Sequence, residues 1–359
     1  MIDWLIDDDA HGTFLETPEE AVTYDDIRSA MAGAARPGST VVTPSADPGS
    51  VIEIYRGLGR GPLIVTGRDQ AVDTRLSQDV MTLLFTSGTT GRPKSVPLTR
   101  DNWLAAVSGS AAHLDHTRDD VWLIAMPLYH VGGLAVLFRS SFLGARVRLL
   151  PTFQPEQFAD EMTGGATIVS VVPTMLRRIL DVDGREYDGL RAVLVGGGPI
   201  PPGLLEQAWE GGMPALPTYG MTETCAQVAT LRPGSEPAYR ADLVPGMEAR
   251  ITDAGRIALR GGQVFNGYLE GSGLDESGWF VTGDVGVLDG RSLRVVGRAD
   301  DVIVTGGLNV DPVRVEQALT SHEGVSGAMV VGVPSAEWGS EVVCLYAGRA
   351  DEAELREHV

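Results

Sequence analysis

The sequence of 359 residues predicts an α/β protein with two domains. The large amino-terminal domain, residues 1–299, is expected to contain layered β-sheets and helices together with a small β-barrel-like part. The small carboxy-terminal domain, residues 300–359, is expected to be α+β and incomplete. Three observations lead to this prediction: strand-like and helix-like segments alternate up to about residue 244, short strands with tight turns follow, and a new unit begins after Gly307.

Four short apolar runs are typical of buried parallel strands. They are residues 80–85, 121–126, 167–172 and 190–195. Helices are expected at residues 100–112, 155–162, 173–180 and 202–209. Thr99 can cap the first helix, and a proline begins each of the others, which suits a first helical turn. Alternation of strand and helix favours a layered domain with a largely parallel sheet.

The rest of the chain has a different pattern. Residues 246–262 and 279–297 contain short strands interrupted by Gly, Asp and Asn, which are typical of antiparallel β-structure with tight turns. One helix and two strands are then expected, at residues 311–319, 328–333 and 341–346. We therefore place the domain boundary near Asp300.

The composition argues against several classes of function. The formal net charge of −20 at pH 7 repels the phosphates of nucleic acids and of anionic lipids, so binding to either is not expected. The acidic first nine residues lack the basic segment of a signal peptide, and no apolar stretch approaches the roughly 20 residues of a membrane-spanning helix. We expect a cytoplasmic protein, in which Cys225 and Cys344 are reduced thiols.

The segment from Thr86 to Lys94, with the sequence TSGTTGRPK, follows a predicted strand and can form a phosphate-binding loop. Glycines let the backbone turn its N–H groups inward, serine and threonine hydroxyls add donors, and a lysine ends the loop. Pro93 stands where a Walker A loop needs glycine, so this is a different kind of loop. An ordinary Gly/Ser/Thr turn is the alternative.

Three further segments place polar residues beside predicted strands. In PTYGMTET, residues 217–224, Tyr219 can stack on a base and Glu223 can hold Mg²⁺ through an oxygen atom. Asp284 follows the strand-like WFVTG and can accept the hydroxyls of a ribose. Residues 297–309, GRADDVIVTGGLN, can form a hinge and a gate. Taken alone, each segment is explained as well or better by an ordinary turn, strand or solvated loop.

Together and in this order, the four segments resemble the motifs of the adenylate-forming superfamily, which includes acyl-CoA synthetases, luciferases and adenylation domains of peptide synthetases. The likeness covers roughly residues 80–345. It implies an acid–thiol ligase that uses ATP and Mg²⁺ to activate a carboxylic acid as an acyl-adenylate. The acyl group would then pass to coenzyme A.

The resemblance implies roles for the matching residues. Catalysis would involve Lys94, His130, Thr222 and Glu223. Binding of ATP, the adenylate or CoA would involve Thr86, Ser87, Gly88, Thr89, Thr90, Gly91, Lys94, Tyr219, Gly220, Thr222, Asp284, Arg298, Gly306 and Gly307. Tyr219 would stack on the adenine, and Asp284 and Arg298 would bind the ribose hydroxyls. Glu223 would hold Mg²⁺, and Asp300 would be the hinge between two half-reactions.

Within the superfamily, the chain resembles the o-succinylbenzoate–CoA ligases of menaquinone biosynthesis most. The string TYGMTETC, residues 218–225, is similar to that family's version, and short forms of the family also carry an early phosphate loop. His130 would lie near the acyl carboxylate or the thiol entry. Arg178 matches the candidate for binding the second carboxylate of the substrate, and an exposed helix arginine is the equal alternative. Homodimers are common in the family.

One feature departs from the family pattern. The small domain of the family ends in a Gly–Lys segment whose lysine contacts the substrate carboxylate and the α-phosphate, and no lysine follows Lys94 in this sequence. We therefore expect a shortened small domain, and a chain that binds ATP and acyl-adenylate but adenylates poorly.

Three alternatives stay open. A different aryl or acyl acid could be the substrate, although a long alkyl chain needs an apolar tunnel. A stand-alone adenylation domain could load a carrier protein, although the acidic surface repels an acidic carrier. A non-catalytic member of the fold could bind nucleotide without turnover.

Overall fold

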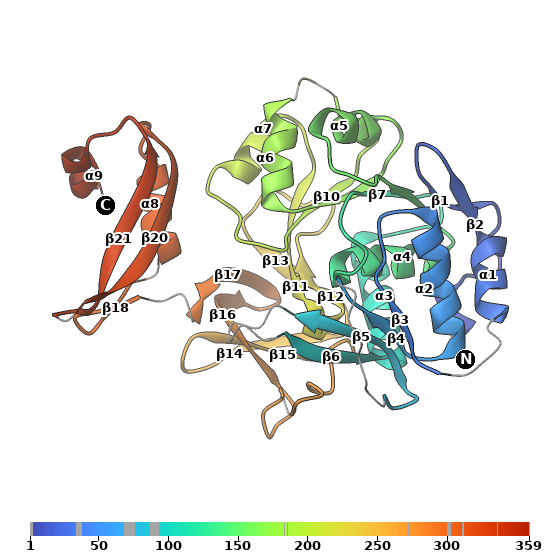
Figure 1. The fold of residues 1–359 in the computed structure, drawn as a ribbon. Helices are drawn as coiled ribbons and strands as arrows, with labels where there is room; N and C mark the ends of the chain where they lie inside the picture. Colours follow the sequence, from blue (N-terminus) through green and yellow to red (C-terminus); the bar gives the residue numbers. More distant parts are fainter. Residues whose placement is uncertain are drawn as a thin grey trace.

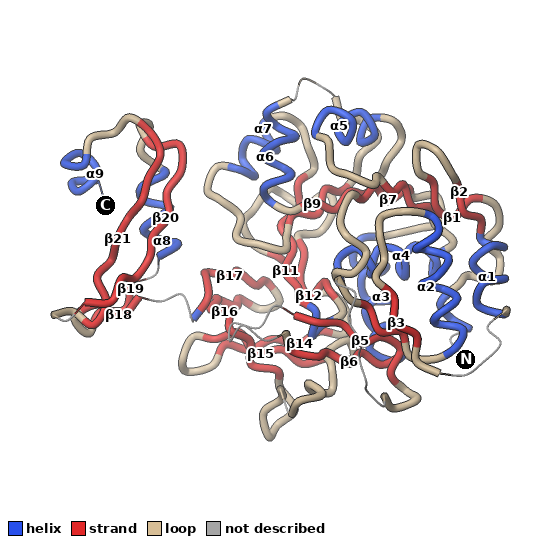
Figure 2. The backbone as a smooth tube through the Cα atoms, viewed as in Figure 1, coloured by secondary structure: helices blue, strands red, loops and turns tan. Residues whose placement is uncertain are grey.

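The structure is a computed structural model that describes residues 3–33, 38–67, 76–86, 93–182, 184, 186–271, 273–299, 303–310, 312–335 and 337–358. Within these residues the chain forms the mixed α/β fold that the sequence predicts, and its largest sheet has 13 strands (Figure 1). Figure 2 shows how the strands, drawn in red, run through the molecule between the helices. A short 3₁₀-helix, η1 (Asp3–Leu5), comes first.

The centre of the large sheet is parallel. In spatial order it contains β11 (Ala215–Met221), β10 (Ala192–Val195), β9 (Ile168–Val171), β7 (Val121–Ile124), β8 (Arg146–Leu149) and β1 (Thr13–Glu16). Strand β2 (Ala21–Thr23) continues the sheet antiparallel to β1. Every residue of β7, β9 and β10 is buried, as is usual for parallel strands covered on both faces. The strands predicted at these three places are confirmed.

The second sheet has four strands. They are β3 (Thr40–Val42), β4 (Leu63–Val65), β5 (Val80–Thr86) and β6 (Lys94–Thr99), of which only β6 is antiparallel to its neighbour. Helix α3 (Arg100–Leu114) follows, and the side chain of Thr99 accepts a hydrogen bond from the backbone of Asn102, which confirms the predicted cap. Helix α3 contacts both sheets, and α4 (Val131–Leu143) packs beside it. Helices α1 (Tyr24–Ala32) and α2 (Pro48–Arg60) complete this side of the fold.

The two faces of the large sheet belong to separate cores. Trp122 and Ile124 of β7 pack in the core that includes α3 and α4, whereas Leu123 points into the other core. That second core lies under α5 (Pro155–Thr163), α6 (Pro173–Asp181) and α7 (Leu204–Glu210). The predicted helices are confirmed, although α7 begins two residues after Pro202, because Gly203 adopts a left-handed conformation with φ of +75°.

The antiparallel part of the large sheet extends from β11. In spatial order it contains β12 (Ala226–Thr230), β13 (Ala241–Leu243), β17 (Ser292–Arg298), β16 (Phe280–Asp289), β15 (Arg256–Gly261) and β14 (Met247–Ile251). The antiparallel strands expected here are confirmed. Where the sequence predicts a β-barrel-like part, these antiparallel strands form an open end of the large sheet. The strands that the structure describes form no closed barrel.

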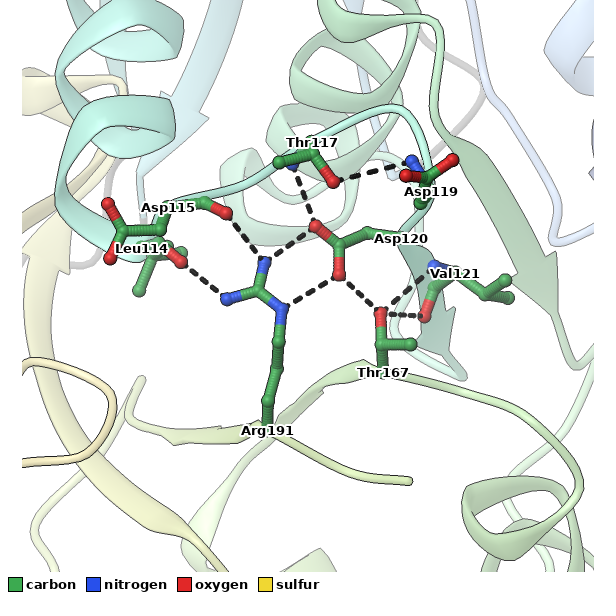
Figure 3. Close-up of polar contacts among 8 residues, drawn as sticks. All are labelled: Leu114, Asp115, Thr117, Asp119, Asp120, Val121, Thr167 and Arg191. Carbon is green, nitrogen blue, oxygen red and sulfur yellow. Dashed lines mark hydrogen bonds and ion pairs between the residues drawn. The ribbon is translucent and has the colours of Figure 1, made fainter. Parts of the chain in front are cut away.

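A polar network lies at the amino ends of three parallel strands (Figure 3). Asp120, Thr167 and Arg191 each come directly before a strand, namely β7, β9 and β10. Arg191 donates to both oxygens of Asp120 at 2.8 and 2.6 Å, and the hydroxyl of Thr167 donates at 2.7 Å. Arg191 Nη1 also donates to the carbonyl of Leu114, the last residue of α3, at 2.5 Å. The network therefore joins a helix end to the strand ends opposite the candidate site.

Residues 303–358 form their own sheets and core. The elements are β18 (Ile303–Thr305), β19 (Leu308–Val310), α8 (Pro312–Thr320), β20 (Val325–Ser335), β21 (Gly339–Gly348) and α9 (Glu352–His358). Ile303, Leu319, Val330 and Leu355 are buried together. The predicted α+β character is confirmed, whereas Asp300, where we expect the boundary, lies outside the described residues.

Two further expectations concern the whole chain. Both cysteines are free, as predicted: Cys225 is buried and Cys344 is exposed. Among the helices that the structure describes, none has the length and apolar character needed to cross a bilayer.

Candidate active site

Several predicted site residues follow the carboxyl ends of parallel strands, which share one edge of the sheet. Strand β7 leads to His130, β9 leads into α6 with Arg178, and β11 leads into a short 3₁₀-helix, η2 (Thr222–Thr224). Strands β5 and β6, which flank the predicted phosphate loop, contact η2. The fold therefore brings the two ends of that loop next to Thr222 and Glu223.

The two ends of the predicted phosphate loop are paired strand residues. Thr86 is the last residue of β5, Lys94 is the first residue of β6, and the two are opposite each other in the antiparallel register. The intervening site residues Ser87, Gly88, Thr89, Thr90 and Gly91 lie outside the described residues. The structure thus fixes where the loop starts and ends, and the assignment of its donors stays a prediction.

Tyr219, Asp284 and Arg298 form one cluster. The hydroxyl of Tyr219 donates to Asp284 Oδ2 at 2.6 Å, and Arg298 Nη1 donates to Oδ1 at 3.3 Å. Asp284 and Arg298 are directly opposite each other on β16 and β17. Burial, and then the negative charge of Asp284, raise the pKa of Tyr219, so the phenol stays protonated. A carboxylate fixed in this way can accept hydroxyl donors of a ribose beside an aromatic ring.

A tight hairpin sets the position of η2. A Cβ atom on Gly220 would lie 1.8 Å from the carbonyl oxygen of Ala226, so only glycine fits in this strand pair. Cys225 and Ala226 both have positive φ, at 50° and 79°, which is uncommon for residues with side chains. The hydroxyl of Thr224 donates to Ala226 O at 3.0 Å. The backbone immediately after Glu223 is therefore strongly constrained.

Glu223 is a buried carboxylate, with only 8% of its surface exposed. Tyr268 donates its hydroxyl proton to Oε1 at 2.8 Å, and the backbone N–H of Phe265 donates to the Glu223 carbonyl at 2.8 Å. No donor among the described residues reaches Oε2. The described residues also contain no group of three or more His, Cys, Asp or Glu that could hold a metal alone. One carboxylate suits Mg²⁺, which is usually held by one or two carboxylates together with substrate phosphates.

Sequence reasoning missed Tyr268 and Glu270. The ammonium of Lys94 lies 4.7 Å from the centroid of the Tyr268 ring. Glu270 accepts hydrogen bonds from the backbone N–H of Ser95 at 3.1 and 3.2 Å. The available signal is the string FNGYLE, residues 265–270, in which a tyrosine follows a glycine between two strands. Lys94 is also the only lysine of the sequence, so every other basic residue outside the histidines is an arginine.

His130 and Arg178 lie apart from these clusters. His130 precedes α4, its ring centroid is 4.5 Å from that of Tyr129, and desolvation lowers its pKa below the usual range. Arg178 is exposed in the last turn of α6, while its neighbour Arg177 donates to Gln207 at 2.7 Å. Within the described part of the chain, no hydrogen bond joins His130 or Arg178 to Tyr219 or Glu223. Their substrate roles stay predictions.

The remaining predicted residues belong to the carboxy-terminal unit. Gly306 and Gly307 form the turn between β18 and β19, with φ of +53° and +83°, which suits a two-residue hairpin turn. Gly306 N–H donates to the carbonyl of Trp338 at 2.9 Å, and a Cβ atom on Gly306 would lie 2.8 Å from that ring. No contact in the described residues brings this turn to Glu223 or Asp284. The hinge role of Asp300 falls on a residue that the structure does not describe.

A cavity of about 620 Å³ lies elsewhere, between α1 and α2. Its lining includes Asp26, Ile52 and Arg56, and none of its lining residues is a predicted site residue. We do not assign it a role in the chemistry.

Comparison with known proteins identifies relatives at the sequence level. A 2-succinylbenzoate–CoA ligase of Enterococcus faecalis is 38% identical over 283 residues, which cover 73% of this chain and 58% of the relative. A 2-succinylbenzoate–CoA ligase of Geobacillus kaustophilus is 42% identical over 305 residues, which cover 78% and 62%. The chain thus spans about three fifths of the length of the curated relatives it matches.

Solved structures agree with this fold. An o-succinylbenzoate coenzyme A synthetase from Bacillus subtilis in complex with AMP superposes with a TM-score of 0.81 at 28% identity, covering 96% of this chain and 88% of that one. The same enzyme in complex with the acyl-adenylate intermediate OSB-AMP gives the same values. The model of the AMP-binding enzyme family matches residues 13–269, and that of its C-terminal domain matches residues 314–359. The chain therefore belongs to the AMP-binding enzyme family.

Proposed function

We propose that this chain is an AMP-forming acid–CoA ligase whose acid is o-succinylbenzoate. The observation that carries the proposal is the cluster of Tyr219, Asp284 and Arg298, in which Asp284 is hydrogen-bonded to residues 65 and 14 positions away in sequence. The names of the relatives support the choice of acid, because they are succinylbenzoate–CoA ligases at 38% and 42% identity.

The geometry suits the first half-reaction, in which a carboxylate oxygen of the acid attacks the α-phosphorus of ATP and pyrophosphate leaves. Tyr219, Asp284 and Arg298 would hold the adenosine. Lys94 and the loop that it ends would place positive charge and N–H donors at the phosphates. Glu223 would hold Mg²⁺, which would neutralise part of the phosphate charge. In the second half-reaction the thiol of CoA attacks the acyl carbon, loses its proton to solvent, and AMP leaves.

The proposal also covers the acid. o-Succinylbenzoate has two carboxylates, and the one that is not activated needs a cation. Arg178 is exposed on α6, which follows a strand whose carboxyl end lies at the site edge. We assign Arg178 to this second carboxylate and His130 to the activated one. As parts of the same proposal, the enzyme acts in the cytoplasm in menaquinone biosynthesis, forms a homodimer, and has two domains that meet at Asp300.

Calorimetric binding of non-hydrolysable acyl-adenylate analogues tests the proposal. We expect the succinylbenzoyl analogue to bind at least tenfold more tightly than benzoyl and hexanoyl analogues, which corresponds to about 1.4 kcal/mol. Arg178→Ala should remove this preference, whereas Arg177→Ala, which changes the neighbouring arginine that is bonded to Gln207, should retain it. Equal affinities for the three analogues would refute the assignment of o-succinylbenzoate as the acid. Failure of every analogue to bind would refute the proposed ligase function.

A further inference from the structure

The segment from Phe265 to Glu270 touches both halves of the candidate phosphate site. On one side, the N–H of Phe265 donates to the carbonyl of Glu223 at 2.8 Å. On the other side, the N–H of Leu269 donates to the carbonyl of Ser95, next to Lys94, at 3.1 Å, and Glu270 accepts from the Ser95 N–H. Hydrogen bonds and a ring contact from one short loop therefore bridge η2 and β6.

Tyr268 makes two of the side-chain contacts in this bridge, one to Glu223 and one to Lys94. Its hydroxyl donates to Glu223 Oε1 at 2.8 Å, and its ring faces the ammonium of Lys94 at 4.7 Å. The ring itself is held in place, because the Phe265 ring meets it edge-on at 4.8 Å and a Cβ atom on Gly273 would come within 2.8 Å of it. Because the ring is fixed and contacts both charged residues, it can hold Glu223 and Lys94 in defined positions relative to each other.

The consequence for Glu223 is a preset orientation. A carboxylate with one oxygen held by a phenol cannot rotate freely, so its other oxygen, Oε2, keeps a fixed direction. The consequence for Lys94 is a preferred place for a flexible side chain, since an ammonium is attracted to the face of an aromatic ring. Both residues would otherwise lose more conformational freedom when a nucleotide binds.

We infer that Tyr268 is a positioning residue that orders Glu223 and Lys94 together for the metal-bound triphosphate. The inference rests on the proposed function, because it assumes that these two residues meet Mg²⁺ and phosphate. In this role Tyr268 would act through Glu223 and Lys94, which it contacts directly, and not through a contact of its own with ATP. If Tyr268 only filled space, removing its hydroxyl would leave Mg²⁺-dependent ATP binding unchanged, and only loss of the ring would have an effect.

The first measurement is calorimetric titration with ATP at a series of Mg²⁺ concentrations. Tyr268→Phe removes the hydroxyl and keeps the ring, and we expect the Mg²⁺ concentration for half-maximal ATP affinity to rise about tenfold, as for other partners that orient a metal ligand. Affinity for ATP without Mg²⁺ should stay within about twofold. Tyr239→Phe is the matched control, because Tyr239 also donates to a glutamate, Glu206, outside the site.

The second measurement uses the single lysine and requires no turnover. An amine-specific reagent labels one side chain, Lys94, and mass spectrometry of its peptide gives the rate. Tyr268→Phe should label at the wild-type rate, because the ring is retained. Tyr268→Leu should label about 2- to 5-fold faster, since a cation–π contact at an exposed site is lost. Thermal unfolding of each variant identifies any that fails to fold.

The outcomes separate this inference from the proposed function. Suppose that the wild-type protein binds Mg²⁺–ATP and that Tyr268→Phe shows the same Mg²⁺ dependence. This result would overturn the positioning role and leave the proposed function intact. Equal labelling of Lys94 in the leucine and phenylalanine variants would overturn the part that concerns Lys94. Wild-type protein that binds no nucleotide would overturn the proposed function and this inference together.

Discussion

Replacing Asp120 by alanine should destabilise the fold by about 3 kcal/mol, at the low end of the cost of breaking a buried ion pair. The Asp120 side chain is 5% exposed and accepts from Arg191, Thr167 and the backbone of Thr117. Its removal leaves the guanidinium of Arg191 without its carboxylate. The low end applies because the Arg191 side chain is 31% exposed and water can take over part of the lost bonding.

Urea unfolding followed by tryptophan fluorescence measures this change. The same experiment on Arg191→Ala and on the double variant gives the coupling energy, which we expect to be about 2 kcal/mol. Arg118→Ala is the control, because Arg118 pairs with Asp7 while 55% of its side chain is exposed, and we expect it to cost less than about 1 kcal/mol. A cost of Asp120→Ala no larger than that of the control would refute the structural role of the network.

The same network predicts a pH dependence. Burial alone would raise the pKa of Asp120, but the hydrogen bonds from Arg191, Thr167 and Thr117 together lower it below its ordinary value. A carboxyl with a lowered pKa in the folded state stabilises the fold fully above its unfolded pKa, and this contribution is lost as the pH falls through the folded value. The difference in stability between wild type and Asp120→Ala should therefore shrink below about pH 4.

Three further changes have defined outcomes. Gly220→Ala places a Cβ atom against the Ala226 carbonyl, so thermal unfolding should show a loss of at least about 3 kcal/mol, and a loss below 1 kcal/mol would contradict the strand register. Burial lowers the pKa of His116 to about 4, so urea stability should fall as the pH drops from about 6.5 towards 4, by up to about 3 kcal/mol, and His116→Phe should flatten this slope. A thiol reagent should label exposed Cys344 in the native protein and Cys225 only after unfolding, and fast labelling of both would contradict the burial of Cys225.

The sequence predicted the elements whose signal is local. The runs at 121–126 and 190–195 are strands because four consecutive apolar residues in each are buried between two helical layers. The cap at Thr99 was also predictable, since a threonine before a helical segment satisfies its first N–H groups. The late start of α7 was not, because a proline before a helix does not reveal that Gly203 will adopt the left-handed conformation.

For the candidate site, too, some features were predictable from the sequence and others were not. Motif order predicted that Tyr219, Asp284 and Arg298 belong to one site, and the structure places them in one cluster. Their hydrogen bonds were not predictable, because they depend on the register of β16 with β17 and on the distance between β11 and β16. Tyr268 was missed for a related reason: it meets Glu223 and Lys94 only through tertiary packing, and the string FNGYLE by itself indicates neither partner.

The single lysine makes the candidate site a place where the chain can be cut selectively. A lysine-specific protease has one bond to cleave, the one between Lys94 and Ser95, which would divide the chain into residues 1–94 and 95–359. Because Lys94 is paired with Thr86 in a hairpin, the protease must wait until that end of β6 opens. The cleavage rate therefore reports the opening free energy of this end of the β5–β6 strand pair, at one known bond and without any introduced label.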